Sequence, residues 1–172
     1  MQKAREWPSL LAVAAALIAG ACHYSNDVIP QDSDAPAQLL TANINNSAFR
    51  AQASVSASYK NEVLTVMGGD GDAQRVTITL YNIDRSGSWP RTFRLDLPGV
   101  SNVGFAQYTE PYSLTSYRFY STAAARGVGS VTITAFSPTK VEGTFSFVAQ
   151  LTEGVGAVLV NVTDGMFAAP VK

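Results

Sequence analysis

The sequence predicts an all-β domain, an antiparallel meander of about nine to ten short strands that forms a β-sandwich of two packed sheets. Hydrophobic residues alternate with polar ones in many short runs, as in strands that bury one face. Residues that favour turns separate these runs. Beyond residue 38, no window of about eleven residues keeps the apolar spacing of a helix. A closed or partly open lipocalin-like barrel is the alternative, because periodicity does not say whether a meander closes.

The clearest pair of strands is the hairpin predicted over Gly129–Gln150. Its first strand alternates polar residues with Val131, Ile133 and Ala135. The segment Phe136–Lys140 breaks the alternation with a proline and two hydroxyl residues, which indicates a turn. The apolar face of the second strand is formed by Val141, Gly143, Phe145, Phe147 and Ala149. We therefore expect Phe145 and Phe147 to be buried, with Thr144 on the opposite face.

The other strands follow from their apolar faces in chain order. These faces are Leu40, Ala42 and Ile44; Phe49, Ala51 and Ala53; Val55, Ala57 and Tyr59; Leu64 and Val66; Val76, Ile78 and Leu80; Phe93, Leu95 and Leu97; Tyr108; Tyr117–Tyr120; and Val158, Val160 and Val162. Predicted turns lie at Asn45-Asn46, Lys60-Asn61 and Gly68–Asp72, and the last strand is predicted to end at Asp164-Gly165.

Composition limits the function classes. The chain has 172 residues, and 15% of them are charged, against about 25% in an average globular protein. Its formal net charge is -1, and its Lys and Arg residues are scattered singly. Because nucleic-acid binding needs a clustered basic face, nucleic acid is not an expected partner.

The first 21 residues are predicted to be a signal peptide. Lys3 and Arg5 precede the short apolar run Leu10–Ile18, and the small residues Ala19–Ala21 suit a cleavage site. The run is much shorter than the ~20 residues of a membrane-spanning helix. Cys22, the sole cysteine, follows directly.

The segment Ile18–Cys22 resembles the lipobox of bacterial lipoproteins, in which the cysteine becomes the lipidated first residue of the mature chain. This resemblance implies a membrane anchor through an N-terminal lipid on Cys22. Ordinary signal peptidase is the alternative, because Ala19 and Ala21 suit it too, and it would leave a free thiol. Residues 22–38 are rich in Asp, Pro, Ser and Asn and are predicted to be a flexible tether, followed by a single β-domain over 39–172.

Residues 39–168 also resemble a group of Bacteroidota-type envelope lipoprotein domains of unknown function. The segments that carry the resemblance are Leu40–Phe49, Ser58–Asp70, Arg75–Ile83, Gly129–Phe147 and Val160–Phe167. The resemblance implies an all-β fold and a lipid-anchored place in the bacterial cell envelope, at the outer membrane. It carries over no catalytic residue.

The pattern of reactive residues does not favour catalysis. His23, the single histidine, lies in the predicted tether, so a Ser-His-Asp site is not expected. No cluster with zinc-ligand spacing is present, and we expect no cofactor and no metal. Gly68–Asp72 is read as a turn in preference to a calcium loop. Five carboxylates leave a two-carboxylate glycoside hydrolase as an alternative: Asp96, Glu110, Glu142, Glu153 and Asp164.

Aromatic and arginine residues cluster in the middle third of the chain and suggest a binding surface. The residues assigned to this surface are Trp89, Arg91, Arg94, Arg118 and Tyr120. On a strand, Tyr117 and Phe119 face opposite to Arg118 and Tyr120, and we expect the first pair in the core and the second pair exposed. A glycan, a peptide or an envelope protein would be the partner.

The leading hypothesis is a non-enzymatic, lipid-anchored envelope protein with a binding or structural role. A barrel that carries a small apolar ligand and a two-carboxylate hydrolase are the alternatives.

Overall fold

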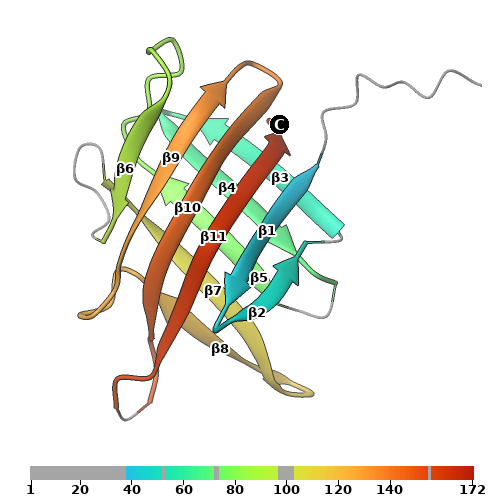
Figure 1. The fold of residues 1–172 in the computed structure, drawn as a ribbon, viewed down its shortest axis with the longest axis vertical. Coiled ribbons are helices and arrows are strands. Elements are labelled where there is room, and N and C mark those ends of the chain that lie inside the picture. The colour runs from blue at the N-terminus through green and yellow to red at the C-terminus, as the bar shows by residue number, and fades with distance from the viewer. Residues whose placement is uncertain (1–37, 52, 72–73, 97–102, 155) are drawn as a thin grey trace, which may run out of the picture. The chain divides into compact units, whose positions relative to one another are not determined.

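The computed structural model describes residues 38–51, 53–71, 74–96, 103–154 and 156–172. These residues form an all-β fold of eleven strands (Figure 1). The strands are β1 (Leu39–Ile44), β2 (Ser47–Arg50), β3 (Ala53–Lys60), β4 (Val63–Gly69), β5 (Arg75–Leu80), β6 (Arg91–Leu95), β7 (Val103–Ser113), β8 (Ser116–Ser121), β9 (Val128–Phe136), β10 (Lys140–Leu151) and β11 (Leu159–Pro170).

Hydrogen bonding joins all of these strands in one sheet. The order along the sheet is β2-β1-β11-β10-β9-β6-β7-β5-β4-β3, and β8 pairs with β7 and with the end of β10. Neighbouring strands are antiparallel except β6 and β7, which are parallel. The predicted all-β, antiparallel class is confirmed, whereas β6 and β8 connect what the sequence suggested as two separate sheets.

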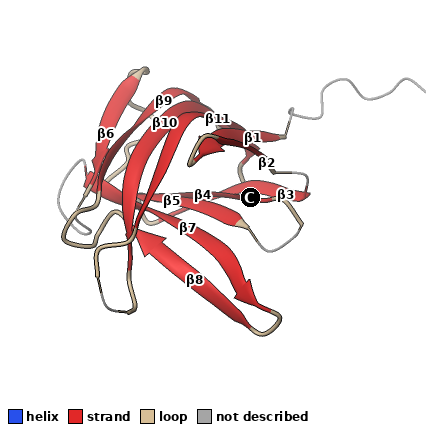
Figure 2. Cartoon of the chain, turned by 60° about the horizontal axis from the view of Figure 1, so that its bottom comes forward, coloured by secondary structure: helices blue, strands red, loops and turns tan. Residues whose placement is uncertain are grey.

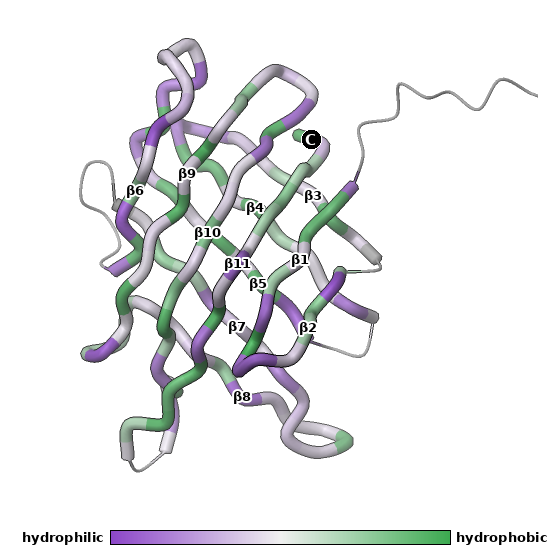
Figure 3. Tube along the Cα trace, in the orientation of Figure 1, coloured by the Kyte–Doolittle hydropathy of each residue, from purple (hydrophilic) through white to green (hydrophobic). Residues whose placement is uncertain are grey.

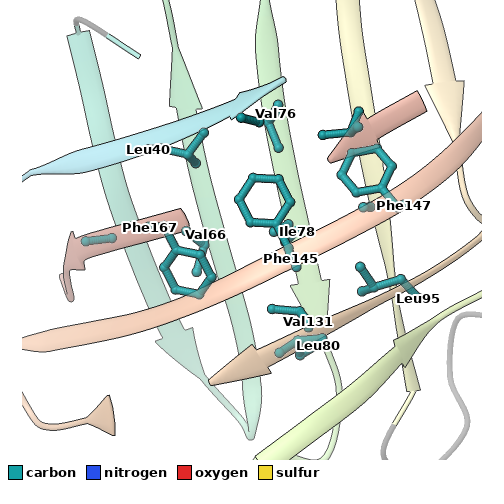
Figure 4. Close-up of a cluster of buried hydrophobic side chains, with 14 of the residues drawn as sticks. Leu40, Val66, Val76, Ile78, Leu80, Leu95, Val131, Phe145, Phe147 and Phe167 are labelled. Atoms are coloured by element: carbon teal, nitrogen blue, oxygen red, sulfur yellow. The ribbon is translucent and has the colours of Figure 1, made fainter. Parts of the chain in front are cut away.

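The sheet bends back so that two layers face each other (Figures 1 and 2). Strands β9, β10, β11 and β1 lie in one layer, and β5, β4 and β3 lie in the other. Hydrophobic residues recur along the strands between hydrophilic ones (Figure 3), and the hydrophobic ones point into the space between the layers. There, Phe145, Phe147 and Phe167 meet the aliphatic side chains of the other layer, Val66, Val76, Ile78 and Leu80 (Figure 4).

The sheet forms a partial ring, because its edge strand β3 meets the residues that follow β11. Ala57 of β3 forms an isolated bridge with Val171, and the Lys172 N–H donates to the Ala57 carbonyl at 2.9 Å. On the interior side of this junction, a Cβ at Gly68 would lie 3.0 Å from the Ala51 side chain and 3.1 Å from that of Leu40. A side chain at Gly68 would therefore require Ala51 or Leu40 to shift by a few tenths of an ångström.

The β9–β10 hairpin has the predicted turn. The Ser137 N–H donates to the Lys140 carbonyl at 2.8 Å, and the Ser137 hydroxyl accepts from the Lys140 N–H at 3.0 Å. Phe145 and Phe147 are buried, and Thr144 is exposed, as predicted.

One residue of this hairpin was assigned to the wrong face. Ala135 is exposed, and Phe136 is buried in its place. The pairing shifts by one residue between β9 and β10, because Ala135 faces Glu142 while Ile133 faces Gly143. This irregularity inserts Thr134 as an extra residue and reverses the alternation after it.

The last strand does not end at Asp164-Gly165, as the turn-like pair suggested. β11 continues to Pro170, and its pairing with both β10 and β1 is irregular at this point. Asp164 has a positive φ of 53°, and its carboxylate accepts from the Asn43 side-chain amide at 2.9 Å. The Asp-Gly pair is therefore a bulge within a strand.

The predicted asparagine turn is confirmed. Asn45 and Asn46 both have positive φ, 48° and 67°, as a two-residue hairpin turn between β1 and β2 requires. The next hairpin turn lies one residue later than predicted, at Asn61 and Glu62, whose φ values are 52° and 62°.

Candidate functional site

The residues predicted to form one binding surface lie in two separate places. Trp89, Arg91 and Arg94 belong to β6 and the loop before it, whereas Arg118 and Tyr120 belong to β8. In Figure 1, the start of β6 lies near the top of the sheet and the β7–β8 hairpin lies at the bottom. The aromatic cluster in the sequence therefore does not form a single patch.

The residues around β6 mainly support the fold. The half-buried Trp89 ring packs 5.7 Å from the ring of Phe136 and 6.5 Å from that of Phe93. The Arg91 guanidinium lies over both Trp89 and Phe93, at 5.8 and 5.3 Å. Arg94 forms an ion pair with Asp96. Arg91 therefore covers rings at the rim of the core, as long side chains do, whereas Arg94 is an exposed partner of Asp96.

The predicted faces of β8 are reversed. Tyr120 is buried, with 4% of its surface exposed, whereas Tyr117 and Phe119 are 50% and 45% exposed. Arg118 is exposed as expected. Tyr120 lies opposite Tyr108 of β7, and the Tyr108 side chain is buried in the core. The cross-strand partner thus decides which face of β8 is inside.

Two buried tyrosines of the β7–β8 hairpin, Tyr108 and Tyr120, share the carboxylate of Glu110. The Tyr120 hydroxyl donates to Glu110 Oε1 at 2.8 Å, and the Tyr108 hydroxyl lies 3.5 Å from Glu110 Oε2. Their rings are 5.9 Å apart. Burial, followed by the charge of Glu110, raises the pKa of Tyr108. Burial and the bond to Glu110 also raise the pKa of Tyr120, while Arg118 opposes this shift.

These shifts predict a loss of stability in alkaline solution. A tyrosine whose pKa is raised on folding contributes stability that is complete below about pH 10 and is lost as the pH rises through its folded pKa. Replacing both Tyr108 and Tyr120 with phenylalanine should therefore reduce the loss of unfolding free energy between about pH 8 and pH 11. Urea melts of wild type and variant at both pH values measure this difference. An equal loss in the two proteins would contradict the assignment.

The far end of the β7–β8 hairpin presents large apolar side chains to solvent. We use the name hairpin surface for Tyr112, Tyr117, Arg118 and Phe119, and Leu114 lies in the turn beside it. Tyr112 is 64% exposed and Leu114 is fully exposed. Figure 2 shows this hairpin standing away from the rest of the sheet. The tip is closed by a 2.6 Å hydrogen bond between the hydroxyls of Ser113 and Ser116.

A groove of about 490 Å³ runs beside this hairpin. It lies between the hairpin and the segment that follows β10, and it is lined by Tyr112, Ser116, Tyr117, Arg118, Phe119, Leu151, Glu153 and Gly154. The Arg118 guanidinium lies 4.0 Å from the centre of the Tyr112 ring, a cation–π contact. A second hollow of about 300 Å³ is lined by Tyr117, Phe119, Arg75 and Thr109.

The carboxylates considered for hydrolysis are distributed over different elements and bind neighbouring groups. Asp96 pairs with Arg94, and Glu142 pairs with Lys140 at 2.6 Å. Asp164 accepts from Asn43, and Glu110 accepts from the buried tyrosines. Glu153 is exposed beside the groove. These contacts give the carboxylates structural roles and carry no argument for hydrolysis.

Among the described residues, no group of three or more His, Cys, Asp or Glu side chains could hold a metal ion. At the Gly68–Asp72 turn, the Asp70 carboxylate accepts from the Gln74 N–H at 3.1 Å and closes the connection between β4 and β5. Asp72, His23, Cys22 and the signal segment lie outside the described residues, as does Leu97. Among the residues that are described, no helix is long and apolar enough to cross a bilayer.

Of the eight residues that line the groove, only Arg118 was predicted from the sequence to belong to a binding surface. Tyr117 and Phe119 were assigned to the core, and Glu153 was considered only as a possible acid. The turn at Leu114-Thr115 would by itself place Tyr120 opposite Thr109, and the irregularity between Pro111 and Ser113 shifts the pairing so that Tyr120 lies opposite Tyr108. The sequence carries no clear signal of this shift.

Comparisons with known proteins give a family without an assigned activity. A family model described as a domain of unknown function, DUF6252, matches residues 37–169. No curated protein and no solved structure matches the chain. The matched range contains β1 to β10 and nearly all of β11, so it includes the groove.

Proposed function

This chain belongs to the DUF6252 family, and we propose that it is a lipid-anchored protein of the bacterial cell envelope that acts by binding through its hairpin surface, without catalysis. Within this proposal the family is of the Bacteroidota envelope lipoprotein type, and the protein is held at the outer membrane. The two facing layers of the sheet then form a sandwich whose halves are joined by β6 and β8.

The proposed anchor is supported by the sequence before the β-domain. A basic start, the short apolar run Leu10–Ile18 and small residues precede Cys22, as in exported lipoproteins. An exported protein with one cysteine has no partner for an intrachain disulfide, and lipidation gives this residue a purpose. A polar segment then separates Cys22 from β1 and would let the domain reach away from the membrane.

The observation that carries the proposed binding role is the exposure of three aromatic rings on one projecting hairpin. Tyr112, Tyr117 and Phe119 are each between 45% and 64% exposed, although β-domains of this size bury most such rings. Exposed apolar surface next to a groove is typical of a site that another molecule covers. The rings add little to the domain's own core, so a role in binding explains them.

The two alternative functions have less support. A carrier of an apolar ligand needs an interior cavity, whereas Phe145, Phe147 and Phe167 occupy the space between the layers (Figure 4). A hydrolase needs two carboxylates facing one cleft, whereas Glu142 and Asp164 are bound to neighbours on the outer face. Neither alternative has a described feature that favours it.

One fractionation experiment tests the proposal. Wild type should sediment with membranes, and Cys22→Ser should remain in the soluble extract, because each buried acyl CH₂ contributes about 0.8 kcal/mol to anchoring. The released Cys22→Ser protein, once concentrated above its level in the dilute extract, should still bind washed envelope fragments, because reversible binding depends on protein concentration. A variant that also carries Tyr112→Ser, Tyr117→Ser and Phe119→Ser should lose that binding. Its circular dichroism and urea midpoint control for folding, since all three side chains are exposed.

The anchor and the binding role fail separately in this experiment. A membrane-bound wild-type chain whose intact mass begins at Cys22 without acyl groups would refute the anchor. Undiminished envelope binding by the triple-serine protein would refute the hairpin surface as the binding site.

A further inference from the structure

We propose that the groove beside β8 binds a neutral carbohydrate, of one or two sugar units, against its aromatic side chains. This inference rests on the proposed binding function and names its ligand class. The groove lies beside the hairpin surface, and its lining combines aromatic residues, the Ser116 hydroxyl and the charged side chains of Arg118 and Glu153.

The groove has the dimensions and walls of a small-molecule site. Its volume of about 490 Å³ lies within the range of roughly 300–1,000 Å³ that such sites occupy. Tyr112, Tyr117 and Phe119 are the aromatic residues of its lining, and Leu151 is an aliphatic one. Pyranose rings have one or two faces of C–H groups, and these faces pack on aromatic rings through apolar contact.

The polar groups around the groove match sugar hydroxyls. Arg118 can only donate hydrogen bonds, Glu153 can only accept them when ionised, and the Ser116 hydroxyl can do both. A hydroxyl group both donates and accepts, so it can use each kind of partner. The groove lining carries one positive and one negative side chain, and this balance favours an uncharged ligand over a phosphate or an acidic polymer.

Several contacts hold the groove in place before a ligand arrives. The Phe119 carbonyl accepts from the Thr152 N–H at 2.8 Å and from the Thr152 hydroxyl at 3.0 Å, which ties β8 to the segment after β10. Arg118 lies against Tyr112, and the Ser113–Ser116 bond closes the hairpin. A site with fixed walls loses less conformational entropy on binding.

A lipid surface fits the groove less well. The most exposed aliphatic side chain of the hairpin, Leu114, does not line the groove, and it would be the first residue to enter a bilayer. If Leu114 entered a bilayer together with the groove, the carboxylate of Glu153 in the groove lining would lose its hydration, which is unfavourable. Leu114 therefore separates the two kinds of ligand in an experiment.

The test is calorimetric titration of the purified full chain with cellobiose, maltose, mannobiose and chitobiose. We expect binding of at least one of these sugars, weakened roughly three- to tenfold by Tyr112→Ala and by Tyr117→Ala. Tyr112→Phe should keep the wild-type affinity, because the ring remains. Leu114→Ala is the matched control, since it removes an exposed side chain of the same hairpin outside the groove, and it should also bind normally.

Three results would overturn the carbohydrate assignment. The first is no heat of binding with any sugar at millimolar concentration while the triple-serine protein still loses envelope binding, which leaves the proposed function intact. The second is sugar binding that survives Tyr112→Ala and Tyr117→Ala. The third is wild-type binding to phosphatidylethanolamine–phosphatidylglycerol vesicles that Leu114→Ala abolishes. If the sugars bind as expected but do not displace the protein from envelope fragments, the carbohydrate site stands and the envelope role fails.

Discussion

Replacing Phe145 with alanine is expected to lower the free energy of unfolding by about 3–5 kcal/mol. The side chain is 4% exposed and lies at the centre of the space between the two layers (Figure 4). Its ring is 6.0 Å from that of Phe147 and 6.3 Å from that of Phe167, so truncation also removes ring contacts and leaves a cavity. A typical domain is stable by only about 5–15 kcal/mol, and this loss would be a large part of the total.

Thr144→Ala is the matched control for this prediction. Thr144 precedes Phe145 on β10 and is exposed on the opposite face, so its truncation should cost well under about 1 kcal/mol. Urea melts of both variants measure the difference. Equal losses would mean that the faces of β10 are assigned wrongly.

The strands themselves could be predicted because each buries one face. Leu40, Ala42 and Ile44 of β1 and Val76, Ile78 and Leu80 of β5 are buried as the alternation indicates. The Asn45-Asn46 turn was also readable, since asparagine tolerates the positive φ that a tight hairpin needs. These features depend on neighbouring residues, and the sequence records them directly.

The two bulges were not predicted, because in a sequence their residues resemble those of turns. Asp164-Gly165 has the composition of a turn, yet it lies within β11 between two paired strands. In the sequence, the extra residue Thr134 shows only as a break in the alternation, and such a break also indicates the start of a turn. Whether a strand continues past such a point depends on partners far away in the chain.

The closure of the sheet also depends on distant residues. The pairing of β6 with β9 and the bridge of Ala57 to Val171 each join segments that do not follow one another in the chain. Alternation identifies the buried face of each strand and says nothing about its lateral partner. The all-β, mostly antiparallel class could therefore be predicted, but the connection of the strands into a single sheet with a partial ring could not.

The candidate site was predicted in composition but not in arrangement. Aromatic residues and Arg118 do form an exposed surface, but its rings are Tyr112, Tyr117 and Phe119, and Tyr120 is inside. The period of a strand says that Tyr117 and Tyr120 lie on opposite faces without saying which is inside. That choice is made by the pairing of Tyr120 with Tyr108, which brings both hydroxyls to Glu110.

Gly165→Ala is expected to destabilise the protein by about 1–3 kcal/mol for a steric reason. Gly165 lies opposite Phe145 in the pairing of β10 with β11. A Cβ there would lie 2.5 Å from two carbon atoms of the Phe145 ring, closer than real Cβ atoms approach other heavy atoms. The ring has little freedom to move, because Phe147 and Phe167 pack against it. Met166→Ala, at the exposed next residue, should cost less than about 0.5 kcal/mol.

The same substitution should have the opposite effect once the ring is absent. In a Phe145→Ala background the new methyl group has room, and alanine in a strand is favoured over glycine by about 0.5–1 kcal/mol because it loses less backbone entropy. We therefore expect Gly165→Ala to stabilise that background slightly, giving a coupling energy of about 1.5–4 kcal/mol in the double-mutant cycle. Urea unfolding of wild type, both single variants and the double variant measures it. A cost for Gly165→Ala that is the same with and without Phe145 would show that the ring is not what excludes a side chain at this position.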